Sequence, residues 1–331
     1  MTVGLVYDTF GDYPWQPGDP PDADAEYEPE ATILALEDAI RHLGHTPQRI
    51  GTAYDLLARL DTLAVDAVVN IAEAAHTRNR EGYVPTLLEM RGIPFLGSDA
   101  LTLSLSLDKC WTKDLAAAAG VTTPPYAAYR SPDDIVASAL PAPFPLFVKP
   151  RYEGSSKGIT PASRVDDLAA LREQVAFVTA TYHQDALVEA FISGGGEFTV
   201  GVIGHAPVEA LPVLQRAVEP TTRIGLHALE HRGLEAQEYG YLLEGQIDAA
   251  LEARLQHDAL VVFRKLECLD FARLDFRVDA HGQPWFLEIN PLPTFDPEGT
   301  FAIAAELMGR SYTDFLADVL ARGLVRIGAS S

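Results

Sequence analysis

One segment near the end of the chain, RLDFRVDAHGQPWFLEIN at 273–290, constrains the fold more than any other. Two runs of alternating polar and apolar residues flank a His-Gly pair at 281–282, which is the pattern of two antiparallel strands joined by a tight turn. A turn centred there sets Arg277 opposite Phe286. Because side chains alternate along a strand, one face of the hairpin is predicted to hold Arg273, Asp275, Glu288 and Asn290. The other face is predicted to be dry and to hold Leu274, Phe276, Val278, Trp285, Leu287 and Ile289.

The polar face of this hairpin sets two acids against each other. In the predicted register Asp275 faces Glu288, and two carboxylates that face each other in a sheet repel by up to about 1 kcal/mol. One interpretation is that Asp275, Glu288 and Asn290 hold a magnesium ion, which prefers oxygen ligands. The other is a solvent-facing sheet in which Arg273 neutralises the acids. The pattern alone does not decide between the two.

A second segment, KPRYEGSSKG at 149–158, follows an apolar strand and is rich in glycine and serine. Small residues let backbone amides approach phosphate oxygens, and serine hydroxyls add donors. The spacing is not that of a Walker loop, and a Gly/Ser segment by itself is more often an ordinary turn. The chain has only five lysines, however, and three of them are Lys109, Lys149 and Lys157. Together these features indicate a polyphosphate site.

Charge and composition exclude several classes of partner. The net charge of −22 argues against nucleic acid and anionic membranes, because phosphate contacts require basic surface. No run of about 18 apolar residues is present, so no membrane span is expected. The start, MTVGLVY, lacks the basic region of a signal peptide. With only Cys110 and Cys268, both expected to be packing residues, we predict a cytoplasmic protein without a disulfide framework.

Strands alternate with helices in the first third of the chain, which indicates a parallel α/β lobe. Strands are predicted there at 3–7, 66–71 and 93–97, and helices at 29–43 and 84–91. Later strands are predicted at 144–149, 186–190, 197–203, 271–279 and 284–290, and helices at 108–119, 165–180, 248–266, 299–308 and 312–322. The segment 219–244 has weak periodicity and is predicted to be a long mobile loop that covers a site.

The order of these motifs resembles the ATP-grasp superfamily, and within it the D-alanine–D-alanine ligase branch. The resemblance covers residues from about 66 to 320, and it rests on LLE, GIPFLGS, LDK, VKP with EGSS, VE with SG and EFTV, and RLDF with LEINP. It implies an α/β (α+β) fold of three parts. These are a Rossmann-like N-terminal domain at 1–97, a central ATP-grasp lobe with the phosphate loop at 98–192, and a C-terminal ATP-grasp lobe with the metal-binding hairpin at 193–331. ATP would lie between the sheets of the last two.

The resemblance also implies a role for each matching residue. Nucleotide contacts would come from Lys109, Lys149, Glu153, Gly154, Ser155, Ser156, Glu189, Ile192 and Glu197. Two magnesium ions, for which manganese may substitute, would be bound by Asp275, Glu288 and Asn290. Arg273 would stabilise the oxyanion formed during amide-bond formation, and Ser155 in the phosphate loop is counted with it as catalytic. A homodimer is the common state of the family.

The substrate-reading positions depart from the family pattern. After the metal turn, where relatives bind the carboxylate of the second alanine, this chain has Asp296, Glu298 and Gly299. Two acids there would repel an acceptor carboxylate. The amine of the first substrate would be held by Glu28 or by Glu26, and the alternative for both is a solvated acidic loop.

These observations predict an ATP-dependent carboxylate–amine ligase that works through an acyl-phosphate. Its substrates would be an amino acid or similar small carboxylate and a small-molecule amine other than alanine. One alternative is an authentic D-alanine–D-alanine ligase of cell-wall synthesis. Another is a non-catalytic nucleotide-binding homologue.

Overall fold

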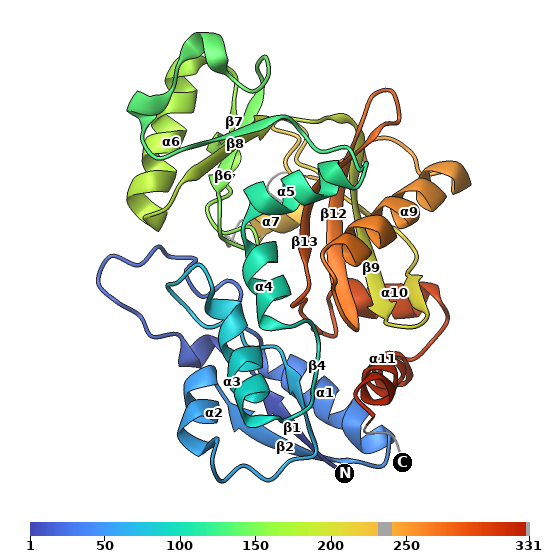
Figure 1. The fold of residues 1–331 in the computed structure, drawn as a ribbon. Coiled ribbons are helices and arrows are strands. Elements are labelled where there is room, and N and C mark those ends of the chain that lie inside the picture. Colours follow the sequence, from blue (N-terminus) through green and yellow to red (C-terminus); the bar gives the residue numbers. More distant parts are fainter. Residues whose placement is uncertain (231–239, 329–331) are drawn as a thin grey trace.

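Parallel strands organise the first lobe, as the alternation of strands and helices predicts. The computed structural model describes residues 1–230 and 240–328, and this lobe lies at the bottom of Figure 1. Its sheet has the order β2-β1-β3-β4 with parallel pairing throughout. The strands are β1 (Thr2–Val6), β2 (Thr46–Gly51), β3 (Ala67–Asn70) and β4 (Phe95–Leu96). The helices are α1 (Glu30–His42), α2 (Ala53–Arg59) and α3 (Tyr83–Arg91).

The second lobe is an antiparallel sheet covered by one long helix, at the top of Figure 1. The sheet has the order β5-β8-β6-β7. Its strands are β5 (Tyr126–Tyr129), β6 (Leu146–Pro150), β7 (Arg164–Val165) and β8 (Ala186–Ala190), and its helix is α6 (Leu168–Tyr182). The helix begins where the Asp167 side chain accepts a hydrogen bond from the amide of Ala170. It buries Leu171, Val175 and Val178 against the sheet.

The third lobe carries the largest sheet, in the order β10-β9-β12-β13 with β11 also paired to β9. The strands are β9 (Gly194–Gly204), β10 (Val208–Ala210), β11 (Leu214–Arg216), β12 (Phe271–Asp279) and β13 (Pro284–Asn290). Helix α9 (Ala249–Lys265) packs on this sheet, and so do α4 (Ala100–Leu107) and α5 (Lys109–Ala118), which contact β13. All three sheets lie within the predicted ranges 1–97, 98–192 and 193–331. Since α4 and α5 fall in the middle range but pack on the third sheet, those boundaries stay a prediction.

The end of the chain ties the third lobe to the first. Helices α10 (Thr300–Leu307) and α11 (Tyr312–Arg326) follow the last strand, and α11 packs against α1. One buried cluster joins Val3 and Ile33 of the first lobe to Phe271 of β12 and Phe315 of α11. The first lobe is therefore seated on the third sheet through a shared apolar core.

The hairpin β12–β13 keeps the predicted pairing at its open end and departs from it nearer the turn. Asp275 pairs with Glu288 and Arg273 with Asn290, but the next pair is Phe276 with Phe286, so Leu287 is an extra residue in β13. The predicted pairing of Arg277 with Phe286 is therefore wrong, and Arg277 faces Trp285. Because β13 has one extra residue at this bulge, the side chains on either side of the bulge no longer follow one alternation between the two faces of the sheet.

The bulge also corrects the predicted dry face. Phe286 faces the core, and its ring centroid lies 5.8 Å from that of Phe276. Trp285 is half-buried and donates its indole N–H to Asp279 at 3.0 Å, so its assignment to the core is wrong. Leu287 lines a cavity between the second and third lobes.

Other predictions are tested by the described residues. The two cysteines are free and buried, as expected. No helix in the described part of the chain is long and apolar enough to cross a bilayer. The predicted loop 219–244 contains a short helix, α7 (Leu226–Glu230), and Val218 forms isolated bridges with Gly225 and Leu242. Its residues 231–239 lie outside the described residues.

Candidate active site

A cavity between the second and third sheets, here called the interlobe cavity, has apolar walls and a charged floor. The walls come from Phe147 on β6, from the 191–192 segment after β8, and from Ile159, Ile224 and Leu287. The floor is polar and consists of Lys149, Glu189, Glu197, Asp275, Arg277 and Glu288. Flat apolar walls beside a few charged groups suit a heterocyclic base that carries phosphates.

Two lysines and a glutamate form a buried ion cluster at this floor. Glu189 on β8 lies 2.9 Å from Lys149 Nζ and 2.6 Å from Lys113 Nζ, and the Lys113 side chain is fully buried. Burial favours the neutral acid, but the two ammonium groups hold the pKa of Glu189 below its usual value. Glu189 and Ile192, which are predicted to contact the nucleotide, both line the interlobe cavity, and the Glu189 side chain also positions Lys149. The role of Lys113 was not predicted.

The polar face of the hairpin lies beside this cluster. Asp275 accepts a hydrogen bond from Thr199 at 2.7 Å and forms an ion pair with Arg273 at 3.2 Å. Glu288 forms ion pairs with Lys109 at 3.3 Å and with Lys149 at 3.9 Å. Despite burial, the lysine charges lower the pKa of Glu288 to about 2, so this carboxylate is ionised near neutral pH.

A second cavity, here called the Arg273 cavity, lies on the other side of Glu288 among all three lobes. Its lining residues are Glu26, Glu73, Glu81, Ser106, Leu107, Lys109, Gly154, Ser155, Arg273, Glu288, Ile289, Asn290 and Pro291. Glu288 lines both cavities. A phosphate chain that starts in the interlobe cavity would therefore end beside Arg273.

The donor set of the hairpin fits magnesium. Asp275, Glu288 and Asn290 offer carboxylate and amide oxygens on one face, which are the ligands that hard divalent cations take. Across residues 1–230 and 240–328, no group of three or more His, Cys, Asp or Glu side chains is arranged to hold a metal. Two carboxylates without a full protein cage suit magnesium, which commonly completes its shell with water and substrate phosphates.

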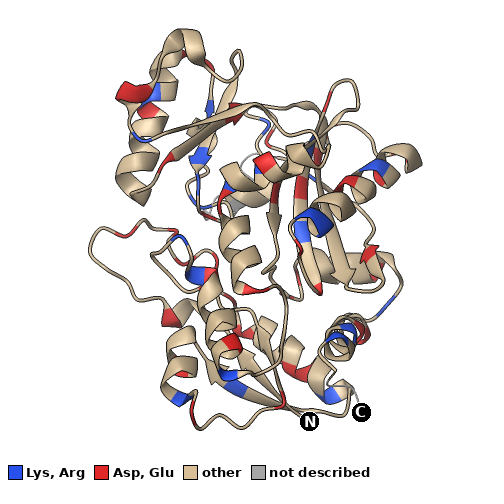
Figure 2. Ribbon diagram, in the orientation of Figure 1, with Lys and Arg blue, Asp and Glu red and all other residues tan. Residues whose placement is uncertain are grey.

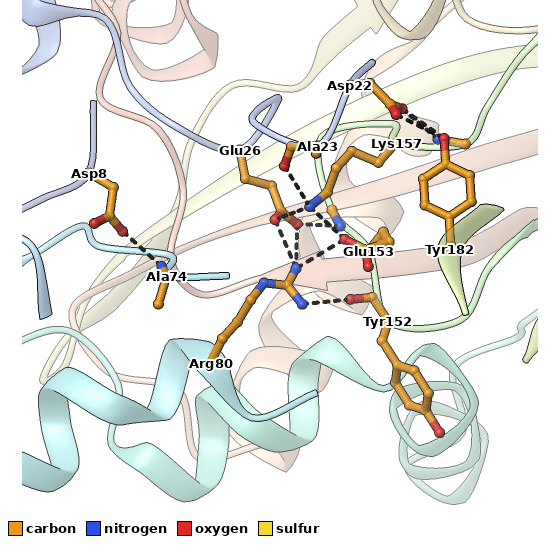
Figure 3. Close-up of polar contacts among 12 residues, drawn as sticks. Asp8, Asp22, Ala23, Glu26, Ala74, Arg80, Tyr152, Glu153, Lys157 and Tyr182 are labelled. Atoms are coloured by element: carbon orange, nitrogen blue, oxygen red, sulfur yellow. Dashed lines mark hydrogen bonds and ion pairs between the residues drawn. The ribbon is translucent and has the colours of Figure 1, made fainter. Parts of the chain in front are cut away.

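The phosphate loop is held against the first lobe through its backbone and its lysine (Figure 3). The amide of Gly154 donates to Glu26 at 2.6 Å, and a Cβ at this glycine would lie 2.7 Å from the same carboxylate oxygen. Lys157 Nζ lies 2.6 Å from both Glu26 and Glu153. Ser155 and Ser156 adopt left-handed backbone angles, with φ of 42° and 59°. The loop is thus shaped by contacts to residues outside it.

An arginine from the first lobe completes this anchor. Arg80 Nη2 lies 2.8 Å from both carboxylate oxygens of Glu26 and 3.4 Å from Glu153, and Arg80 Nη1 donates to the carbonyl of Tyr152. Figure 3 shows Glu26, Arg80, Glu153 and Lys157 converging on one point. We call these four residues the loop anchor. Glu153, predicted to contact the nucleotide, thus has its carboxylate in the anchor, and Gln184 also donates to it at 2.7 Å.

The position of Glu197 agrees with a role at the nucleotide. It lines the interlobe cavity, 3.6 Å from Arg277 and 3.5 Å from Nδ1 of His227. Burial raises its pKa. The guanidinium of Arg277 also lies over the ring of Phe191, 4.6 Å from its centroid.

The predicted substrate residues lie together but outside the Arg273 cavity. Glu28 accepts hydrogen bonds from Thr32 at 2.7 Å and Thr294 at 2.8 Å. Asp296 accepts from the amide of Glu298 at 2.8 Å, and Gly299 precedes α10 as its N-cap. None of Glu28, Asp296, Glu298 and Gly299 is among the residues that line that cavity. Of the two glutamates considered for the amine, Glu26 lines it.

Several residues of the two cavities were missed by sequence reasoning. They are Glu73, Glu81, Arg277, His227 and Leu287. Arg80, which belongs to the loop anchor, was missed as well. Because side chains alternate along a strand, Arg277 could have been predicted on the same face as Asp275, and the structure places both in the lining of the interlobe cavity. The other residues carry no local signal, because their positions depend on contacts between lobes.

Comparisons with known proteins identify relatives of this chain. Residues 115–321 match the family model described as D-ala D-ala ligase C-terminus. A D-alanine–D-alanine ligase of Cupriavidus taiwanensis is 34% identical over 250 residues, which is 75% of this chain and 73% of that protein. The ligase of the same name from Aquifex aeolicus is 30% identical over 290 residues, covering 87% and 93%. An uncharacterised protein of Sinorhizobium fredii is 34% identical over 76% of this chain and 73% of its own length.

Solved structures show the same fold. The D-alanine–D-alanine ligase of Bacillus anthracis, crystallised with ATP, superposes with a TM-score of 0.72 at 18% identity over 100% of this chain and 99% of that one. The VanG D-Ala:D-Ser ligase of Enterococcus faecalis gives 0.70 at 20% identity over 97% and 99%.

The fold class predicted from the sequence is thereby confirmed: this is an ATP-grasp ligase, an enzyme that forms carbon–nitrogen bonds. Within that class, the chain belongs to the D-alanine–D-alanine ligase family. Enzymes of this family use ATP and magnesium and act on small molecules.

Proposed function

We propose that this chain joins a small carboxylate, such as an amino acid, to an amine other than D-alanine through an acyl-phosphate. The observation that carries the proposal is that two cavities meet at Glu288, one suited to a nucleotide and one containing Arg273. A carboxylate is a poor acyl donor because its leaving group would be oxide, and phosphorylation by ATP replaces that group with phosphate.

The residues divide this work between them. Lys149 and Lys109 would hold the phosphates, with Lys109 on the side of the Arg273 cavity. Asp275, Glu288 and Asn290 would hold two magnesium ions, for which manganese can substitute, and the metal would neutralise charge on the transferred phosphoryl group. Arg273 would then stabilise the oxyanion that forms when the amine attacks the acyl-phosphate.

The phosphate loop would exclude water from this intermediate. Gly154 and Ser155 line the Arg273 cavity, and Ser156 lines the interlobe cavity, so the loop spans both. Water would otherwise hydrolyse the acyl-phosphate before the amine reacts. A role for Ser155 beside the reacting carboxylate, predicted from the sequence, is part of this proposal.

A second candidate is an authentic D-alanine–D-alanine ligase, which is favoured by the names of several relatives. Against it, Glu73 and Glu81 line the Arg273 cavity without an ion-pair partner among the described residues and disfavour the free carboxylate of an alanine acceptor. A non-catalytic homologue is disfavoured because Lys109, Lys149 and Arg273 are kept together with the metal-binding residues. A homodimer is proposed from the family resemblance alone, and sedimentation would test it. A cytoplasmic location is proposed from the scarcity of cysteines.

The test is phosphate release from ATP over a panel of amino acids and amines, each offered singly and in pairs. We expect release only when a carboxylate substrate and a different, amine-bearing substrate are supplied together, and about 10²–10³-fold slower release by Arg273→Ala. Glu37→Gln, which removes an acid on α1 that lines neither cavity, is the matched control, and its phosphate release should be unchanged. Robust turnover with D-alanine as both partners would overturn the altered acceptor. ATP binding without turnover over the whole panel would overturn the ligase activity.

A further inference from the structure

Two glutamates of the first lobe line the Arg273 cavity without a partner. Glu73 follows β3, and Glu81 lies in the short 3-10 helix Arg80–Gly82 before α3. They are only 7% and 5% exposed. Neither carboxylate has a hydrogen bond or ion pair with any residue in the described ranges. We call Glu73 and Glu81 the acid pair.

The third acid of this cavity is fully engaged. Glu26 accepts from Arg80, from Lys157 at 2.6 Å and from the amide of Gly154 at 2.6 Å. The charges of Arg80 and Lys157 outweigh its burial and lower its pKa to about 2. With both oxygens occupied by these groups, Glu26 has no free position for a substrate amine. A cation that enters the cavity would therefore meet the acid pair.

Buried acids without partners are costly, and proteins keep few of them. Burial and the nearby charges of Glu81 and Glu26 raise the pKa of Glu73 well above its usual value, and burial raises that of Glu81 to about 7. Charged groups that act on the pair include Glu26, Arg80, Lys109 and Lys157. The acid pair therefore has a free-energy cost that ligand binding would offset.

The chemistry of the pair indicates which ligand offsets that cost. Glu73 and Glu81 would offer a metal ion two carboxylates only, because Glu26, the third acid of the cavity, is already engaged by Arg80 and Lys157. A primary ammonium carries one positive charge and three N–H donors. It can satisfy two carboxylates at once and still point its carbon skeleton toward Arg273.

We propose that Glu73 and Glu81 form a subsite for a substituent ammonium group of one of the two substrates, in the cavity where the amide bond is made. This inference rests on the proposed function, because it assigns the cation to a ligase substrate. The subsite favours substrates with an amine in addition to the reacting group and disfavours neutral or anionic substituents at the same position.

The experiment measures binding rather than turnover. The wild-type protein, saturated with magnesium and a non-hydrolysable ATP analogue, is titrated by calorimetry with matched pairs of compounds: D- and L-alanine against D- and L-lactate, serine against glycerate, and lysine against 6-aminohexanoate. We expect at least one amine to bind about tenfold more tightly than its match, and that preference to vanish in Glu73→Gln/Glu81→Gln. Glu37→Gln is again the control and should keep the preference.

Thermal unfolding of the same variants separates this role from a structural one. Since the acid pair has no partner, the glutamine variants should have a Tm equal to or higher than that of the wild type. A lower Tm would overturn the proposal. So would a wild type with no preference for any amine, including one that binds none of the panel, or a preference that survives in the double variant.

The two failures are distinguishable. Loss of phosphate release with every substrate pair would refute the proposed ligase, while the binding preference would still be measured. Normal phosphate release without an amine preference at the acid pair would refute the subsite and leave the ligase standing.

Discussion

The two cavities that meet at Glu288 treat their buried charges in opposite ways. In the interlobe cavity each acid has a partner, as Glu189 does with Lys113 and Lys149. In the Arg273 cavity, Glu73 and Glu81 have no hydrogen bond or ion pair within the described ranges. The protein itself thus pairs the acids of the interlobe cavity, while the Arg273 cavity keeps two buried acids that have no such partner among the described residues. Figure 2 shows that acidic residues are distributed over all three lobes, so local pairing, rather than net charge, distinguishes the two cavities.

The largest expected effect comes from the residue that both cavities share. Glu288→Gln removes a charge that pairs with Lys109 and Lys149 and a proposed ligand of magnesium. Phosphate release should fall by about 10³-fold, because this site would lose transition-state charge stabilisation. The rate should recover little at high magnesium. A fall of less than tenfold would mean that the meeting of the cavities is not where the chemistry occurs.

The next effect concerns the loop anchor, where charge is paired as it is in the interlobe cavity. Arg80→Met leaves Glu26 and Glu153 with Lys157 as their main counter-charge. We expect the free energy of unfolding to fall by about 3 kcal/mol, measured by urea denaturation. Adding Glu26→Gln to that variant should restore part of the loss, because the uncompensated acid is removed. Strictly additive losses would show that the two side chains do not act as a unit.

A smaller effect is expected on how the stability of the protein depends on pH, and it tests whether Glu81 lacks a partner. The pKa of Glu81 is raised by burial from 4.5 to about 7 in the folded state. Between these values the unfolded chain has lost a proton that the folded chain retains, so the stability of the wild type should fall as pH rises from 4.5 to 7. Glu81→Gln should remove that loss and be more stable than the wild type at pH 8 by on the order of 2 kcal/mol, with little difference at pH 4.5. Chemical denaturation at the two pH values measures this. A variant that is less stable at pH 8 would contradict it.

The smallest effect is expected at Glu28, the glutamate first predicted to hold the substrate amine. Its carboxyl is engaged by Thr32 and Thr294, outside the residues of the Arg273 cavity. Glutamine can keep both contacts, so Glu28→Gln should change KM for either substrate by less than about threefold. A much larger change in KM at constant kcat would return the amine site to Glu28 and weaken the case for the acid pair.

Local patterns were sufficient for the parts of the site that lie on one element. The pairing of Asp275 with Glu288 follows from strand alternation and a tight turn, and both are properties of one short segment. The bulge at Leu287 was not predictable in this way, because it depends on how β13 fits its neighbours. The choice between Glu26 and Glu28 had the same limit, since they are two residues apart and only contacts with the phosphate loop distinguish them.

The acid pair illustrates a further limit. Glu73 and Glu81 lie in a segment with no periodicity, and they come to face Arg273 only because the first lobe is seated on the third sheet. No pattern within 70–82 carries that information. The apolar stretches that pack the first lobe against the third sheet were predictable. The polar residues that this packing brings together were not.

The loop anchor has a consequence for engineering by recombination. The backbone amides of Gly154 and Gly158 donate hydrogen bonds to Glu26 and Asp22, so the phosphate loop and the first lobe are held together as one unit. Grafting the N-terminal third of a relative onto this chain would also replace the side chains that hold the phosphate loop in place. Chimaeras in this lineage should therefore exchange 22–26, 80 and 153–158 as a set, whatever the nominal borders of the parts.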